Sequence, residues 1–153
     1  MQRRAFRAMG TEIELFLDAP NEVATLVEAE AEFHRLEKLL SRFRSDSELS
    51  RLNRDGAIHA SSDLVEVTKL ALQARERTGG RFDPTVHEAL VAAGYDRSFE
   101  LVSQEDGQSQ SARCGGTVRV CGHHVELEPG FKLDFGGIGK GVQTCTTTAG
   151  GLQ

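Results

Sequence analysis

Apolar and polar residues alternate over residues 11–17, where Ile13 and Leu15 share one side of the chain. A period of two is typical of a β-strand with one buried face. From residue 21 to about residue 42 the apolar residues recur at helical spacing instead, and the glutamates fall on the opposite face. The pattern therefore predicts a strand followed by a long amphipathic helix, with Asn21 as its N-cap.

Capping signals predict three further helical segments. Residues 45–53 favour a short capped turn of helix. A long helix is expected over residues 63–77, with Asp63 as its N-cap in a capping-box pattern. Asp83 precedes a proline, a pair that is typical of an N-cap and the first helical position. A helix is therefore expected to run from there to Gly94.

The last third of the chain is expected to hold short strands. Residues 97–116 are polar and rich in glycine and serine, which predicts a loop. Apolar alternations at residues 118–120 and 125–127 flank a glycine and predict a hairpin. Residues 132–135 are expected to form a last short strand. The elements together predict an α+β fold, with a mixed or antiparallel sheet and flanking helices.

Length and charge narrow the functional classes. A chain of 153 residues suits one domain with a sizeable core. A net charge of −5 disfavours nucleic acid as a partner, because proteins that bind it need a basic face. No apolar run reaches the roughly 18–20 residues of a membrane span, and charged residues interrupt any signal-peptide core near the N-terminus. The chain as written is therefore expected in the cytoplasm, without a membrane segment.

The cysteines and histidines predict neither a disulfide framework nor a metal site. Three cysteines without a C-x-x-C spacing suggest reduced thiols. His123 and His124 are adjacent in the predicted hairpin turn, where neighbouring side chains point apart. A metal site needs several converging ligands, so this pair alone is a poor candidate.

The strongest chemical signal is the segment Leu133-Asp-Phe-Gly-Gly-Ile-Gly-Lys-Gly141, in which four glycines surround Lys140. Glycine tolerates a positive φ and has no Cβ, so such a loop turns tightly and lets a ligand approach the backbone. Free N–H groups ahead of a helix suit a phosphate. The spacing matches neither the P-loop nor the G-x-G-x-x-G dinucleotide fingerprint. Taken alone, the loop is also compatible with an ordinary glycine-rich turn between a strand and a helix.

Four segments in a fixed order give this loop a context. They are Phe6-Arg-Ala-Met-Gly-Thr11, residues 41–53, Thr78-Gly-Gly-Arg-Phe-Asp-Pro-Thr85 and the glycine-rich segment itself. Together they strongly resemble the ApbE family of FAD:protein FMN transferases, once called thiamine-biosynthesis lipoproteins. The resemblance implies an α+β fold that binds FAD and Mg²⁺. It also implies a reaction that splits the FAD pyrophosphate, releases AMP and leaves FMN esterified to a threonine of an acceptor protein.

The same resemblance assigns site residues. It places one Mg²⁺ ligand at the backbone carbonyl of Gly137. It places flavin contacts at Met9, Phe43, Arg81, Phe82, Asp83, Asp134 and Lys140. Their chemistry agrees with these roles, since a thioether or an aromatic ring packs on a flat ring system and a lysine neutralises phosphate. Asp134 is expected to accept a hydrogen bond from a ring N–H or a ribose hydroxyl, or to act through the metal. Met9 and Phe43 are alternatively core residues, and Asp83 is alternatively only a helix cap.

The resemblance covers residues 1–141 and leaves residues 142–153 as a non-family tail that is expected to be disordered. We therefore expect the N-terminal portion of the family's domain, with an ApbE-like fold truncated after the glycine-rich loop. Mg²⁺ needs near-octahedral oxygen coordination, which one backbone carbonyl cannot supply, so the chain alone is expected to be inactive. The alternatives are a non-catalytic module that binds a flavin or another phosphorylated ligand, and a fragment without a ligand. Members of the family are often exported and lipid-anchored.

Overall fold

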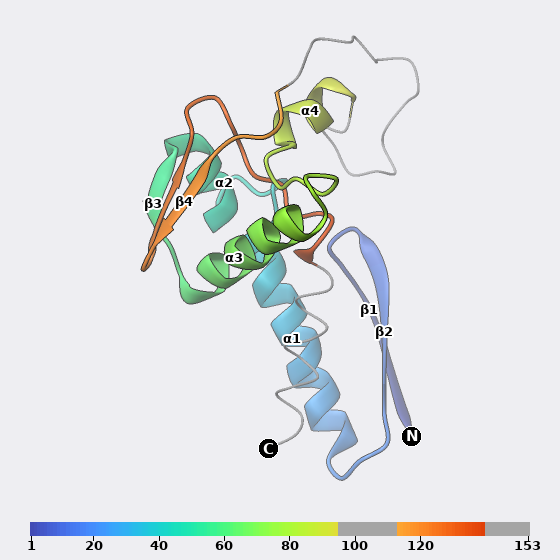
Figure 1. Cartoon of the computed structure of the whole chain (residues 1–153). Coiled ribbons are helices and arrows are strands. Elements are labelled where there is room, and N and C mark those ends of the chain that lie inside the picture. The colour runs from blue at the N-terminus through green and yellow to red at the C-terminus, as the bar shows by residue number, and fades with distance from the viewer. Residues whose placement is uncertain (95–112, 140–153) are drawn as a thin grey trace.

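The structure of the chain is a computed structural model, and it describes residues 1–94 and 113–139. Figure 1 shows an α+β arrangement, in which a hairpin of two strands runs beside one long helix and a lobe of shorter helices and a small sheet lies at one end of them. All the strand pairs of the described residues are antiparallel. The α+β class predicted from the sequence is therefore confirmed.

The hairpin and the long helix form one side of the molecule. Strands β1 (Gln2–Ala8) and β2 (Thr11–Leu17) pair over their whole length, and α1 (Glu22–Leu40) lies alongside. The Phe6 ring lies 5.5 Å from the Phe33 ring in an edge-on contact. This geometry is favoured for aromatic pairs, so the two rings hold the hairpin against the helix.

The remaining elements form the lobe. In chain order they are α2 (Glu48–Asp55), β3 (Ala57–His59), α3 (Ser62–Arg77), α4 (His87–Ala92), β4 (Val118–Cys121) and β5 (His124–Leu127). The sheet has the order β3-β5-β4. Ile58 and Val120 both pair with the buried Val125, so these three side chains lie on the face that is turned to the core.

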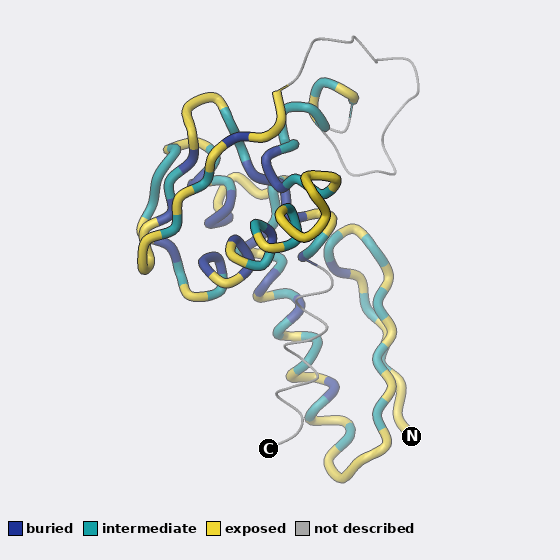
Figure 2. The backbone as a smooth tube through the Cα atoms, in the orientation of Figure 1, coloured by how far each residue is buried: buried dark blue, intermediate teal, exposed yellow. Residues whose placement is uncertain are grey.

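The hydrophobic core lies inside this lobe, where Figure 2 shows most of the buried backbone. Its largest fully buried side chains include Leu49 and Leu52 of α2, Leu64 of α3 and Leu133. Full burial of one leucine contributes about 1.5–3 kcal/mol. Because Leu133 belongs to the segment that leads into the glycines, the core anchors that segment directly.

The hydrophobic pattern predicted several elements correctly. The strand over residues 11–17, the long helix that follows Asn21, the helix that ends at Arg77 and the hairpin around Gly122 are all confirmed. Asn21 occupies the N-cap position of α1, although its side chain makes no capping hydrogen bond. These elements share a local pattern that does not depend on distant partners.

Two predicted helix caps are wrong. Ser61, not Asp63, is the N-cap of α3, and its Oγ accepts a hydrogen bond from Leu64 N at 3.3 Å. Glu48 of α2 completes this cap from another helix, because its carboxylate accepts from Ser61 N at 2.7 Å and from Ser61 Oγ at 2.5 Å. Asp83 does not cap α4, which begins three residues later than predicted, at residue 87 and not at Pro84.

The predicted strand at residues 132–135 is also wrong. Leu133 forms its backbone hydrogen bonds with the side chain of Asn53, and Asp134 N donates to Pro84 O at 2.8 Å. A side chain and a loop carbonyl satisfy this backbone, so the segment joins no strand ladder. Part of the predicted loop over residues 97–116 lies outside the described residues, and its last four residues have no regular structure.

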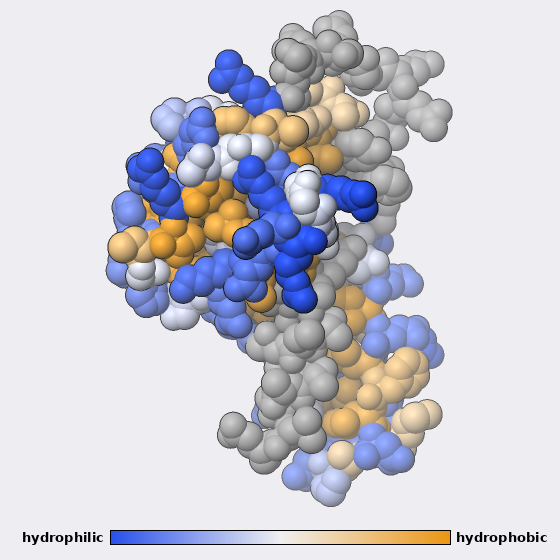
Figure 3. Space-filling model, viewed as in Figure 1, coloured by the Kyte–Doolittle hydropathy of each residue, from blue (hydrophilic) through white to orange (hydrophobic). Residues whose placement is uncertain are grey.

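The surface is mixed, with charged side chains over α3 and apolar surface towards the lower end of the hairpin and of α1 (Figure 3). Phe16, Val23 and Val27 are the large apolar residues exposed there. In the described part of the chain, no helix combines the length and the apolar character that crossing a bilayer requires.

Candidate flavin site

The glycine loop, defined here as residues 133–139, turns without unusual backbone angles. Ile138 N and Gly139 N both donate to Phe135 O, at 3.0 and 2.7 Å. Gly136, Gly137 and Gly139 do not have a left-handed φ. These three glycines therefore serve through their missing side chains. The expectation that they also adopt a positive φ is wrong.

Side chains from two distant segments, and one from the loop itself, lie against these glycines. A Cβ placed on Gly137 would lie 3.0 Å from Cε2 of Phe82, and one on Gly139 would lie 3.4 Å from Cε of Met9. A Cβ on Gly136 would lie 2.9 Å from Oδ1 of Asp134. The structure therefore brings Met9 and Phe82, two of the predicted flavin contacts, against the loop that contains a third, Asp134.

Asp134 is the charged residue of the glycine loop, and it is buried, with 7% of its surface exposed. Its Oδ1 accepts a hydrogen bond from Gly136 N at 2.7 Å. Its Oδ2 lies 2.7 Å from Nε of Arg42, whose side chain is also largely buried. The Arg42 N–H is not aligned on Oδ2 as a hydrogen bond requires, so we describe this contact as an ion pair. Both carboxylate oxygens thus face protein groups.

Arg42 also links Asp134 to Phe43. The guanidinium carbon of Arg42 lies 4.4 Å from the centre of the Phe43 ring, within the range of a cation–π contact. The Phe43 ring is 53% exposed, so the alternative that Phe43 is a core residue does not hold. An aromatic face next to the loop remains open to a ligand.

Met9 sits at the tip of the β1–β2 hairpin. Met9 and Gly10 form its two-residue turn, with φ values of 52° and 70°. A left-handed backbone costs a residue with a Cβ roughly 1–2 kcal/mol. Glu37 of α1 holds the turn in place, since its Oε1 accepts a hydrogen bond from Met9 N at 2.7 Å. The turn thereby presents the Met9 thioether to the glycine loop.

Asp83 organises the turn that carries Phe82. Its Oδ1 accepts hydrogen bonds from Thr85 N and Oγ1 at 2.9 and 2.7 Å, and its Oδ2 accepts one from Gly115 N at 2.6 Å. Burial raises the pKa of Asp83, but the hydrogen bonds from Thr85 and Gly115 outweigh it and hold the pKa below 3.8. These bonds explain why Asp83 does not cap α4. Arg81 is exposed on the same turn.

Asn53 was not singled out by the sequence, yet it clamps the glycine loop. Its Nδ2 donates to Leu133 O at 2.9 Å, and its Oδ1 accepts from Leu133 N at 2.7 Å. Asn53 ends the segment over residues 41–53 that carried part of the family resemblance. That position was the available signal for its role, and the clamp fixes where the loop begins.

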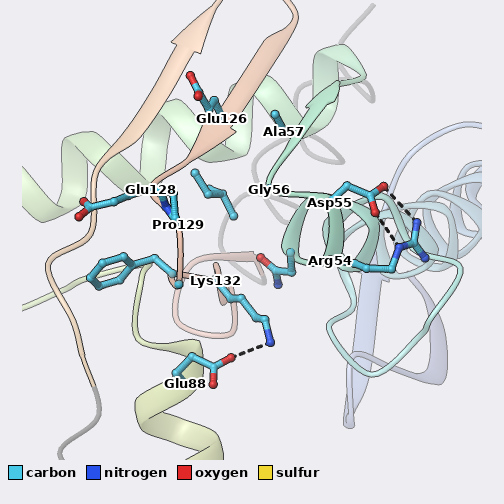
Figure 4. A pocket seen from close by; sticks show the side chains of 13 residues that line it. Arg54, Asp55, Gly56, Ala57, Glu88, Glu126, Glu128, Pro129 and Lys132 are labelled. Carbon is cyan, nitrogen blue, oxygen red and sulfur yellow. Dashed lines mark hydrogen bonds and ion pairs between the residues drawn. The ribbon is translucent and has the colours of Figure 1, made fainter.

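A polar cluster next to the loop was also missed. Lys132 Nζ lies 2.8 Å from Glu88 Oε1, as Figure 4 shows, and His87 Nδ1 lies 3.4 Å from the same oxygen. Burial lowers the pKa of His87 below 6.5, and the hydrogen bond from Lys132 lowers the pKa of Glu88. Glu88 and Lys132 line a cavity of about 610 Å³, together with residues 53–57 and 126–131. The predicted flavin contacts that the structure describes lie outside that lining.

The described residues do not complete a metal site. Within residues 1–94 and 113–139, no three His, Cys, Asp or Glu side chains are grouped as a metal ion would require. Gly137 is exposed, but the nearby carboxylate of Asp134 is committed to Arg42 and Gly136. These groups of the described residues fall short of octahedral oxygen coordination, so they do not fit Mg²⁺ by themselves. Lys140 lies outside the described residues.

The chain is similar to one known protein family. A model of the ApbE family matches residues 9–145, a range that includes every residue placed at the loop above. No curated protein matches the chain.

Three solved structures have a similar fold. The ApbE protein of Thermotoga maritima aligns with a TM-score of 0.82 at 20% identity, over 97% of this chain and 51% of its own. The flavin transferase ApbE of Vibrio cholerae aligns with a TM-score of 0.75 at 19% identity, over 97% and 52%. The flavinyl transferase ApbE of Pseudomonas stutzeri, in its apo form, aligns with a TM-score of 0.72 at 22% identity, over 97% and 54%. This chain thus spans about half the length of these structures, and the likeness establishes the fold.

Proposed function

Because this chain belongs to the ApbE family, we propose that it carries the N-terminal part of the flavin site of an FAD:protein FMN transferase. The observation that carries the proposal is the convergence of Met9, Phe82 and the Arg42–Asp134 pair on the glycine loop. A loop that served only as a turn would not need contacts from three separate segments, which here carry Met9, Arg42 and Phe82. The fold shared with flavin transferases of two bacteria supports the same assignment.

The proposed reaction joins FMN to a threonine of an acceptor protein. The threonine oxygen forms a bond to the phosphorus of the FMN half of FAD, and the bond from that phosphorus to the bridging oxygen breaks. AMP leaves with the bridging oxygen, and the hydroxyl proton is released. FAD supplies the transferred group and the leaving group, so no further reactant is consumed.

The residues of this chain are proposed to bind and orient FAD. Met9, Phe43 and Phe82 offer a thioether and two aromatic rings, which suit a flat ring system. Glycines that lack Cβ atoms let the pyrophosphate approach the backbone of the loop, and Lys140 is proposed to add a positive charge there. Asp83 holds the turn that presents Phe82.

Transfer is proposed to depend on Mg²⁺, with the backbone carbonyl of Gly137 as one ligand. The metal would neutralise charge on the phosphate groups. Since the described residues offer no complete ligand set, we propose that the 153-residue chain binds FAD but does not transfer FMN by itself. In this form it matches the second candidate function, a non-catalytic module that binds a flavin or another phosphorylated ligand.

The test separates binding from transfer. The purified chain is incubated with FAD, Mg²⁺ and a threonine-containing acceptor peptide. Binding is followed by flavin fluorescence, AMP by chromatography and covalent flavin by mass spectrometry. We expect FAD to bind without AMP release. Covalent flavin on the peptide would refute the proposed inactivity, and the absence of any FAD binding would refute the flavin site.

Two phenylalanines provide a matched pair of variants for the binding measurement. Phe43 and Phe16 are similarly exposed, at 53% and 56%, but Phe16 lies at the end of the hairpin that is remote from Met9. Phe43→Ala should weaken FAD binding about three- to tenfold, the equivalent of one aromatic contact. Phe16→Ala should leave the affinity unchanged. Equal effects of the two changes would contradict the placement of the flavin beside Phe43.

A further inference from the structure

We propose that Arg42 keeps the glycine loop receptive to an anionic ligand, because its charge neutralises the buried carboxylate of Asp134. This role rests on the proposed flavin site, to which the family resemblance assigned Asp134 but not Arg42. Arg42 would act through Asp134 and is therefore a positioning residue, which sets the charge that an arriving pyrophosphate meets.

The geometry holds Arg42 in this place from two sides. Its Nε lies 2.7 Å from Asp134 Oδ2, and the two side chains are only 14% and 7% exposed. Its guanidinium carbon lies 4.4 Å from the centre of the Phe43 ring. The carboxylate and the aromatic face together restrict the orientation of the guanidinium, so its charge stays beside Asp134.

The loop needs this compensation because of where Asp134 points. Its Oδ1 accepts the N–H of Gly136, so the carboxylate sits directly against the backbone that suits a phosphate. Charges that are buried are screened little by water and salt, so a bare carboxylate here would repel a pyrophosphate. Two cations close in sequence to Asp134 or to Arg42 are engaged elsewhere, since Lys132 pairs with Glu88 at 2.8 Å and Arg44 pairs with Asp46 at 3.0 Å.

Two other roles for Arg42 make different predictions. If Arg42 were only structural, its loss would weaken every flavin by the same factor, whatever the charge of the flavin. If Arg42 touched the phosphate directly, removing the charge of Asp134 would not restore the affinity that is lost with Arg42. Neutralisation requires that the loss depend on the charge of the ligand and that removal of the Asp134 charge reverse it.

The experiment measures dissociation constants of riboflavin, FMN and FAD by flavin fluorescence with the whole chain. The variants are Arg42→Gln, Arg42→Lys, Asp134→Asn and the double variant with Arg42→Gln and Asp134→Asn. Arg44→Gln is the control. Arg44 lies two residues from Arg42 and forms an exposed ion pair with Asp46, so this variant removes the same charge at a position that does not contact Asp134. Asparagine at position 134 keeps an oxygen that can accept the N–H of Gly136.

Neutralisation predicts that Arg42→Gln weakens FAD about tenfold or more, which corresponds to about 1.4 kcal/mol, and weakens riboflavin less than about threefold. The double variant, which lacks both charges, should bind FAD within about threefold of the unmodified chain, because the loss in Arg42→Gln comes from the bare carboxylate. Arg42→Lys, which keeps the charge, should stay within about threefold of the unmodified chain. This variant also answers the question if Arg42→Gln fails to fold.

Three results would overturn the proposal. They are an equal loss for FAD and riboflavin, a double variant that binds FAD as weakly as Arg42→Gln does, and a loss in Arg42→Lys as large as that in Arg42→Gln. If the unmodified chain binds no flavin, the proposed function fails by itself. The same variants are then titrated with inorganic pyrophosphate, followed by the midpoint of thermal unfolding. If the pattern is missing there too, the role of Arg42 is refuted.

Discussion

Replacing Asn53 by alanine should destabilise the chain by about 2–4 kcal/mol. The change removes both hydrogen bonds between the Asn53 amide and the backbone of Leu133, at 2.9 and 2.7 Å. Leu133 is fully buried, so water cannot replace the lost partners. An unsatisfied buried donor or acceptor costs about 1–3 kcal/mol. Alanine returns up to about 0.7 kcal/mol through its higher helix propensity within α2.

The assay is urea-induced unfolding followed by far-ultraviolet circular dichroism, together with thermal unfolding. At about 2–4 °C per kcal/mol for a chain of this size, the midpoint should fall by roughly 5–15 °C. Arg51→Ala is the control, since Arg51 is exposed on the same helix and its change should stay within about 0.5 kcal/mol. Asn53→Asp should fall between these two, because it keeps the acceptor for Leu133 N and loses the donor to Leu133 O.

The same clamp positions the glycine loop, so Asn53→Ala should also weaken FAD binding by the folded chain. The reasoning would be refuted if Asn53→Ala lowered the free energy of unfolding by less than about 1 kcal/mol. In that case the Leu133 backbone finds other partners, and the loop does not depend on α2.

Three further predictions test other parts of the structure. Glu48→Ala removes the buried carboxylate that accepts from the partly buried Ser61 N, so the free energy of unfolding in urea should fall by about 1–2 kcal/mol. No change would contradict the cap between the helices. Burial lowers the pKa of His87, so its contribution to the free energy of unfolding is full above pH 6.5 and is lost as the pH falls through the folded-state pKa. In urea unfolding, His87→Gln should therefore lose less stability at acid pH than the unmodified chain. A larger loss in this variant would contradict the lowered pKa. Gly137→Val should weaken FAD binding, measured by fluorescence, because its side chain would collide with Phe82; unchanged affinity would place the ligand elsewhere.

The helices and the β4–β5 hairpin could be predicted because their signals are local. Strand β1 could not, because Arg3, Arg4 and Arg7 hide its alternation. In the structure Arg3 pairs with Glu14 and Arg4 pairs with Glu30. A strand whose charges are matched by residues of the next strand and of a helix has no signature of its own in the sequence.

The errors have the same origin. Asp83 followed by proline has the composition of a helix start, but its oxygens are taken by Thr85 and by Gly115 from a segment much later in the chain. Residues 132–135 have the composition of a strand, but Asn53 and Pro84 supply their backbone partners. In both cases tertiary hydrogen bonds decided between two locally acceptable conformations.

The candidate site was predicted in part. Motifs located Met9, Phe82 and Asp134, which the structure brings to the glycine loop. Arg42 and Asn53 were missed because an arginine and an asparagine in a polar stretch resemble solvent-exposed residues. Only the fold reveals that both are turned inward to support the loop.

The contact between Met9 and Gly139 has a consequence for the order of events during protein synthesis. A ribosome adds about 5–20 residues per second, so on the order of 10 seconds separate the two residues on the nascent polypeptide. Over that interval the strained tip of the hairpin exists without its counterpart. The contact between the hairpin tip and the glycine loop therefore forms only after both segments have been synthesised, so a ligand that needs this contact cannot template the first steps of folding.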